Sequence, residues 1–169
     1  MTDVILFLGL LFALLSVPCG TLAETGVDAF LDLHRLVGNW EAKTASGAII
    51  RVSYRPISRD SALVETFTTA SGVETLTIYH PDGPNLLATH YCAQGNQPRL
   101  RLQPESTKTT LQFSFYDATN LRAPSASHLT RLRFQLRDAD HFDKTEIYTE
   151  GGTDGETVLE FVRVQKSER

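Results

Sequence analysis

Three consecutive residues, His90, Tyr91 and Cys92, form the most reactive run in the sequence, because a cysteine beside a histidine can become a thiolate nucleophile. In a β-strand, however, alternation places His90 and Cys92 on one face and Tyr91 on the other. Side chains two positions apart then lie about 6.6 Å from each other, which exceeds the hydrogen bond that a catalytic pair needs. We therefore predict no catalytic residues and no enzymatic activity. A packing or barrel-rim role is favoured for this run.

A metal site is equally poorly supported. His80 and His90 lie on opposite arms of a predicted hairpin that turns at Asp82-Gly83, which separates them by more than about 15 Å. Neither Cys-x-x-Cys nor His-x-x-x-His spacing occurs in the sequence. The formal net charge of -4 argues against nucleic acid as a partner. We expect no metal and no cofactor.

Two polar features have both a binding and a structural interpretation. The amide-rich loop 94–98, which contains Asn96, could form a polar rim that recognises a ligand head group. Ordinary turn chemistry is the favoured interpretation, because Gly95 supplies positive φ and Asn96 caps the backbone. Rows of arginines could face the lumen and hold a carboxylate, or face solvent and pair across strands with Asp143, Glu146 or Glu160. The outward orientation is favoured for these arginines, which are Arg99, Arg101, Arg131, Arg133 and Arg137.

The N-terminus predicts export. Residues 4–17 form an apolar run that is too short to span a membrane comfortably and suits the hydrophobic region of a signal peptide. We predict a signal peptide over residues 1–23, cleavage after Ala23, and a mature domain over residues 24–169 in the periplasm or outside the cell. A retained anchor and a lipoprotein at Cys19 are less favoured alternatives. Cleavage leaves Cys92 without an internal disulfide partner, and no membrane contact is expected afterwards.

The remaining sequence predicts one helix followed by strands. Helical spacing over residues 25–37 places Val27, Phe30, Leu31, His34 and Val37 on one apolar stripe. Thereafter the period is two, with Gly, Pro, Asn and Asp at the breaks. Ten antiparallel strands without intervening helices favour an all-β, up-and-down barrel, since closure removes exposed edges. The predicted strands are 39–45, 48–58, 61–69, 73–80, 85–92, 98–103, 109–117, 129–137, 141–149 and 157–166.

Gly38-Asn39-Trp40, at the junction between the helix and the first strand, resembles the calycin superfamily of lipocalins and fatty-acid-binding proteins. The resemblance implies that Trp40 plugs one end of the barrel and that Arg163 stacks on its ring. The segments 77–83 and 89–99 resemble an uncharacterised family of exported bacterial lipocalin-like proteins. The resemblance covers most of residues 30–165.

Two departures from related barrels restrict this comparison. Nitrobindin-like haem barrels have a glycine-rich extension after the tryptophan and a haem-ligating histidine near the C-terminus. Here Glu41-Ala42-Lys43 follows Trp40, and the last strand contains no histidine, so haem is not expected. Secreted lipocalins usually contain a disulfide, which this chain cannot form after cleavage.

These observations predict an exported lipocalin-like barrel that binds a small hydrophobic, amphipathic or fatty-acid-like ligand, mainly by apolar burial. His34 is expected to pack rather than to contact ligand. The alternative is a barrel filled by its own side chains that acts as a structural or protein-interaction module. The predicted lumen consists of Phe113, Phe115, Leu132, Phe134 and Phe161, and the predicted ligand contacts are Phe113, Phe115, Phe134, Tyr91, His90, Asn96 and Arg99.

Overall fold

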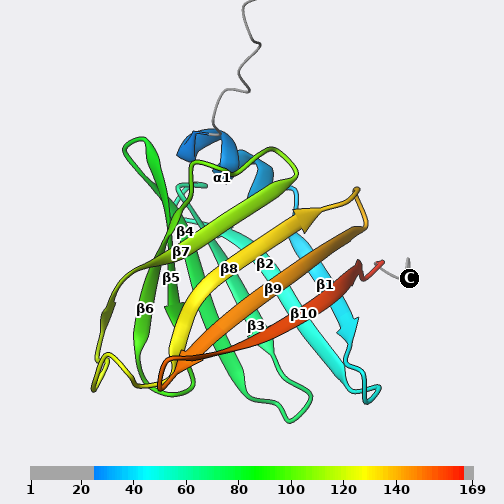
Figure 1. Cartoon of the computed structure of the whole chain (residues 1–169). Coiled ribbons are helices and arrows are strands. Elements are labelled where there is room, and N and C mark those ends of the chain that lie inside the picture. Colours follow the sequence, from blue (N-terminus) through cyan, green and yellow to red (C-terminus); the bar gives the residue numbers. More distant parts are fainter. Residues whose placement is uncertain (1–24, 166–169) are drawn as a thin grey trace, which may run out of the picture.

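Ten antiparallel strands form one closed barrel with a short helix across one end (Figure 1). The structure is a computed structural model that describes residues 25–165, so the predicted signal peptide lies outside the described residues. Around the barrel the strand order is β1-β10-β9-β8-β7-β6-β5-β4-β3-β2. The elements are α1 (Gly26–His34), β1 (Gly38–Lys43), β2 (Ile49–Ile57), β3 (Ala62–Thr68), β4 (Glu74–Asp82), β5 (Asn85–Tyr91), β6 (Gln97–Leu102), β7 (Thr110–Thr119), β8 (His128–Leu136), β9 (His141–Glu150) and β10 (Thr153–Arg163).

The predicted fold class is confirmed, and every predicted strand is present within a few residues of its expected ends. The largest difference is at β10, which begins at Thr153 rather than at residue 157. Gly151 and Gly152 alone make the turn with positive φ, and Gly155 lies inside the strand. Within residues 25–165, no helix is long and apolar enough to cross a membrane.

The phase predicted for the helix is wrong. Val27 and Leu31, which were assigned to the buried stripe, are 50% and 61% exposed. Phe30 is buried as predicted, but its buried neighbours on the helix are Gly26, Ala29 and Leu33. The reason is a close backbone approach: the Gly26 amide donates to the Pro84 carbonyl (3.0 Å), on the turn between β4 and β5. A residue without a side chain therefore sets which face of α1 lies against the barrel.

We call the end covered by α1 the helix end, and the opposite end, formed by turns 44–48, 69–73, 92–96, 120–127 and 151–152, the loop end. Figure 1 shows α1 and the β9–β10 turn at these opposite ends. The helix end is packed solid by aromatic rings. Phe142 contacts Trp40 edge to face with 4.8 Å between centroids and stacks on Phe161 at 5.0 Å. All three side chains are 1% exposed, so this half of the barrel is filled.

Trp40 and Arg163 form the contact that the resemblance implied. The Arg163 guanidinium lies 4.0 Å from the centroid of the Trp40 ring. It also donates to the carbonyls of Arg35 and Val37, while Trp40 Nε1 donates to the Leu36 carbonyl (2.7 Å). One arginine of the last strand therefore fixes the first strand and the segment after the helix together.

The seam between β10 and β1 is short. Their register contains the pairs Trp40↔Arg163 and Glu41↔Val162, whereas β10 pairs with β9 all the way from Thr153 to Val162. Residues 153–158 of β10 are all exposed, including Thr157, whose side chain shares the inward face with Phe161. The β1–β10 pairing therefore closes the barrel at the helix end, whereas residues 153–158 of β10 are accessible to solvent.

The Gly26 contact can be tested by Gly26→Ala. An added Cβ would lie 2.2 Å from the Asn85 carbonyl carbon, which is backbone and cannot rotate away. We expect a loss of about 1–3 kcal/mol in the free energy of unfolding, measured by urea denaturation. Gly155→Ala is the matched control, because its Cβ would meet its first neighbour at 3.9 Å. Equal effects of the two substitutions would contradict the close approach.

Candidate functional site

Buried charges lie inside the half of the barrel nearer the loop end. Glu65 of β3 and Lys144 of β9 form an ion pair with both side chains 1% exposed. The other oxygen of Glu65, Oε2, accepts hydrogen bonds from the hydroxyls of Tyr54 (3.0 Å) and Tyr79 (2.7 Å). Burial and the Glu65 carboxylate raise the pKa of both tyrosines, so they remain neutral donors. A fully bonded carboxylate thus forms the floor of the site, directly above the aromatic packing.

A second carboxylate approaches Lys144 from its own strand. Glu146 Oε1 lies 2.8 Å from Lys144 Nζ, and the Glu146 side chain is 18% exposed. Burial disfavours both charged forms, but the mutual attraction prevails: it raises the pKa of Lys144 and lowers that of Glu146. Lys144 Nζ also lies 5.1 Å from the centroid of the Phe67 ring. The ammonium is therefore enclosed, whereas Glu146 faces the accessible part of the barrel.

His90 belongs to this interior cluster. Its Nδ1 lies 3.0 Å from the Thr77 hydroxyl and its Nε2 lies 3.0 Å from the Tyr148 hydroxyl. Burial lowers the pKa of His90, despite the opposing effect of Glu146, so the ring is neutral near pH 7. Burial, with Glu146 and Cys92 as further causes, raises the pKa of Tyr148. His90 is thus a neutral bridge between the hydroxyls of Thr77 and Tyr148.

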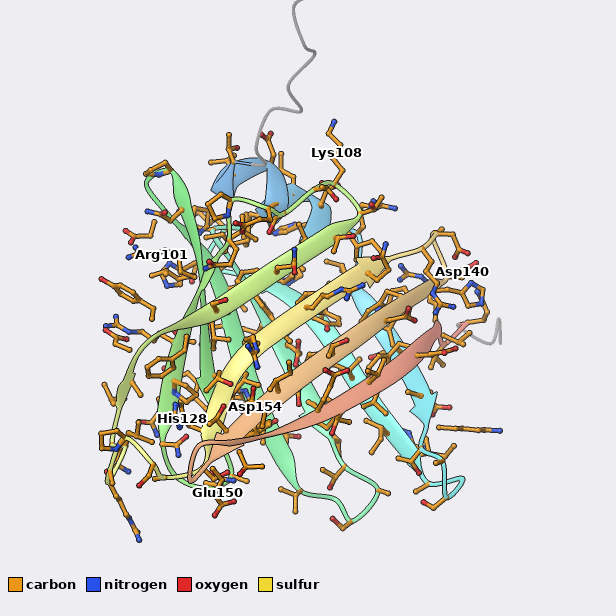
Figure 2. The ribbon with its side chains drawn as sticks, in the orientation of Figure 1. Arg101, Lys108, His128, Asp140, Glu150 and Asp154 are labelled. Carbon is orange, nitrogen blue, oxygen red and sulfur yellow. The ribbon has the colours of Figure 1, made fainter. Side chains whose placement is uncertain are left out.

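A hollow of about 440 Å³ opens beside Tyr148 at the loop end. Figure 2 shows Glu150 and Asp154 there, at the end opposite Lys108. Partly buried apolar side chains, Phe67, Tyr148 and Leu159, pack at the margin of the core. The residues that line the hollow are Ser127, Tyr148, Glu150, Thr153, Asp154 and Gly155. Apolar surface and organised polar groups are therefore both available near this opening, which is the usual composition of a small-molecule site.

A larger hollow of about 530 Å³ lies on the outer face of β7 to β10, away from this cluster. Two of its charged residues belong to surface ion pairs: Arg131 pairs with Asp154, and Asp143 pairs with Arg137. Such exposed pairs are common on protein surfaces and contribute little energy. We therefore take the interior cluster as the candidate site.

Of the predicted ligand contacts, His90 alone belongs to the interior polar cluster. Phe113 and Phe134 are 1% and 0% exposed and pack edge to face on Tyr79, so they form core rather than a free lining. Phe115 is 38% exposed and packs on His128. Tyr91 is 46% exposed, on the strand face opposite His90, as alternation predicts.

The remaining predicted contacts have structural partners. Arg99 lies on the outer face, where it forms an ion pair with Asp117. Asn96 donates to the Ser127 carbonyl (2.9 Å) and so ties the 92–96 turn to the 120–127 loop, which favours the turn interpretation of this segment. The arginine rows face outward. Arg137 pairs with Asp143 and Glu160, as expected from the sequence, but Glu146 pairs with Lys144 instead.

The sequence interpretation did not name Glu65, Lys144 or Tyr148, and it named Glu146 only as a possible partner of the outward arginines. The sequence did contain an indication of them, because polar and charged residues alternate in step with apolar, inward-facing ones. On β9, Phe142, Lys144, Glu146 and Tyr148 are every second residue and share one face. Among residues 25–165, no group of three or more His, Cys, Asp or Glu side chains could hold a metal ion.

The comparisons with known proteins support the fold only. The sequence matches no protein-family model and no curated protein. The structure is similar to the crystal structure of Rv2717c from M. tuberculosis, with a TM-score of 0.55 and 15% sequence identity. The match covers 82% of this chain and 98% of that chain. The ten-stranded barrel is therefore an architecture shared with a solved protein, and the site must be interpreted from its own residues.

The buried ion pair predicts an asymmetric response to substitution. Lys144→Met leaves two carboxylates facing each other without a cation, so we expect a loss of roughly 3–5 kcal/mol in the free energy of unfolding, measured by urea denaturation. Arg51→Met is the control, because it breaks a solvent-exposed pair with Glu41 and should cost less than about 1 kcal/mol. A Lys144→Met protein as stable as Arg51→Met would argue against a charged interior.

The lowered pKa of His90 makes stability depend on pH. The unfolded chain takes up a proton on His90 near pH 6.5, whereas the folded protein resists it. The contribution is therefore fully present above about pH 6.5 and is lost as the pH falls toward the lower folded pKa. We expect the free energy of unfolding to decrease from pH 7 to pH 5 more steeply in the wild type than in His90→Gln. Parallel pH profiles would show that His90 is not buried in its neutral form.

Proposed function

We propose that this protein is a calycin-like barrel that binds a small amphipathic ligand through the interior cluster at its loop end. The observation that carries the proposal is the enclosed network of Glu65, Lys144, Glu146 and His90, which Tyr148 connects to the hollow at the loop end. Burying two charges usually costs more than it returns, and an apolar filling of similar volume would be at least as stable. Ionisable groups whose pKa values are shifted by burial and by a specific charge partner are candidates for a functional site.

The geometry restricts how such a ligand binds. The helix end is occupied by Trp40, Phe142 and Phe161, so an apolar chain has no space beneath the Glu65 floor. The ligand would place its polar group toward Glu146 and His90 and lay its apolar part along Phe67 of β3 and Leu159 of β10. This differs from a ligand that lies deep in an apolar lumen, and it favours a short or flat molecule over a long chain.

The alternative function, a filled barrel that acts as a structural or interaction module, draws support from the same aromatic packing. The half of the barrel nearer the loop end argues against this alternative. A module without a ligand has no need for Glu146, because Glu65 alone neutralises Lys144. We therefore favour ligand binding over the filled module, and a binding protein over an enzyme. We also propose that residues 1–23 direct export to the periplasm or the exterior, where the ligand would be met.

Binding can be tested with a neutral amphipathic fluorophore such as Nile red, together with native mass spectrometry of the purified protein. Thr157→Trp places a bulky side chain beside Glu146, its partner in the β9–β10 register, and should weaken Nile red binding at least tenfold by closing the site. Val158→Trp is the control, because the next residue of β10 points to the outer face and should leave binding unchanged.

Thermal unfolding of both variants establishes that they are folded. The proposal fails if the wild type binds no fluorophore and is ligand-free in native mass spectra. Equal loss of binding in the two tryptophan variants would place the fluorophore outside the barrel.

A further inference from the structure

The inward polar groups do not balance in charge. Glu65 and Glu146 are carboxylates, Lys144 is the basic side chain between them, and His90 is neutral because burial lowers its pKa. Glu65 accepts three hydrogen bonds, from Lys144, Tyr54 and Tyr79, which is the bonding pattern of an ionised carboxylate. The cluster therefore carries one net negative charge within a barrel whose other inward residues are largely apolar.

The charged side chains of the cluster also differ in their exposure to solvent. Lys144 and Glu65 are each 1% exposed and satisfy one another, whereas the Glu146 side chain is 18% exposed. An incoming molecule therefore meets a carboxylate before it meets the ammonium. Lys144 already contacts both carboxylates, so an anion that used its third N–H would lie beside two negative charges and be repelled by them. A fatty-acid-like carboxylate is thus disfavoured at this position.

The residues around the opening also carry negative charge. The six residues lining the hollow beside Tyr148 include Glu150 and Asp154 and no lysine or arginine. Asp154 is already paired with Arg131, and Glu150 is exposed at the loop end (Figure 2). A cleft lined by one sign of charge raises the local concentration of ligands of the opposite sign. The rings of Tyr148 and Phe67 supply aromatic surface, which also attracts cations.

From this arrangement we propose that the ligand is a compact organic cation, with its ammonium group bound by the partly exposed Glu146 carboxylate and its apolar part on Tyr148 and Phe67. The inference rests on the proposed function and specifies the chemical class of ligand. It assigns Glu146 as the principal specificity residue and Glu150 as a long-range contributor at the rim.

Three probes with the same eight-carbon chain provide the test: octylamine, octanoate and 1-octanol, titrated by calorimetry at pH 7 below their aggregation concentrations. We expect octylammonium to bind at least tenfold more tightly than octanoate, with octanol between them. Glu146→Gln should remove most of this preference. Glu156→Gln is the matched control, because Glu156 is an exposed residue of β10 on the outer face, and it should leave the preference unchanged.

Glu150→Gln keeps the test independent of the buried pair. It removes a rim charge without leaving Lys144 short of a partner, so the fold is retained. We expect octylammonium binding to weaken two- to threefold, with an effect that disappears in high salt. Octanoate or octanol binding as tightly as octylammonium, or a preference that survives Glu146→Gln, would overturn the cation assignment while leaving ligand binding intact. No binding of any of the three probes, together with no Nile red binding, would overturn both.

Discussion

The constraint on which this structure depends is the cost of holding the Glu65–Lys144 pair away from water. Neither charge could remain ionised alone at 1% exposure, so each requires the other, and Glu65 requires the hydroxyls of Tyr54 and Tyr79 as well. These groups come from β2, β3, β4 and β9, on different sides of the barrel. The barrel must therefore close with the correct register before the pair can form. The pair then divides the interior into an aromatic half and a polar half.

Closure of the barrel depends on contacts at the helix end. Arg163 stacks on Trp40 and donates to carbonyls after α1, so the seam between the first and last strands is concentrated at the helix end. Because this seam extends over few residues, the remainder of β10 pairs with β9 alone, and residues 153–158 are exposed. The position of this short seam thus explains both the close packing at the helix end and the solvent access toward the loop end. The polar half of the interior lies where the wall is accessible.

Sequence reasoning recovered what depends on local patterns. Alternation and turn residues predicted ten strands and a barrel, and a tripeptide with a late arginine predicted the Trp40–Arg163 contact. Sequence reasoning failed where the position of a residue depends on contacts with residues distant in the sequence. The phase of α1 is set by a backbone contact of Gly26 with the β4–β5 turn, which no hydrophobic pattern reveals. Whether Phe113 and Phe134 line a lumen or fill it depends on barrel diameter and tilt. Glu65 and Lys144 are 79 positions apart and meet only through the strand register.

Glu146 distinguishes a site from a structural network. An apolar barrel needs no buried charge, and a barrel that retains Lys144 needs one carboxylate to neutralise it, which Glu65 provides with full burial and three hydrogen bonds. A second carboxylate adds repulsion toward the first and carries its own desolvation cost. Its partial exposure reduces that cost. A carboxylate that packing does not require, held ionised by its neighbour and partly exposed inside the barrel, is the group on which the proposed ligand-binding role rests.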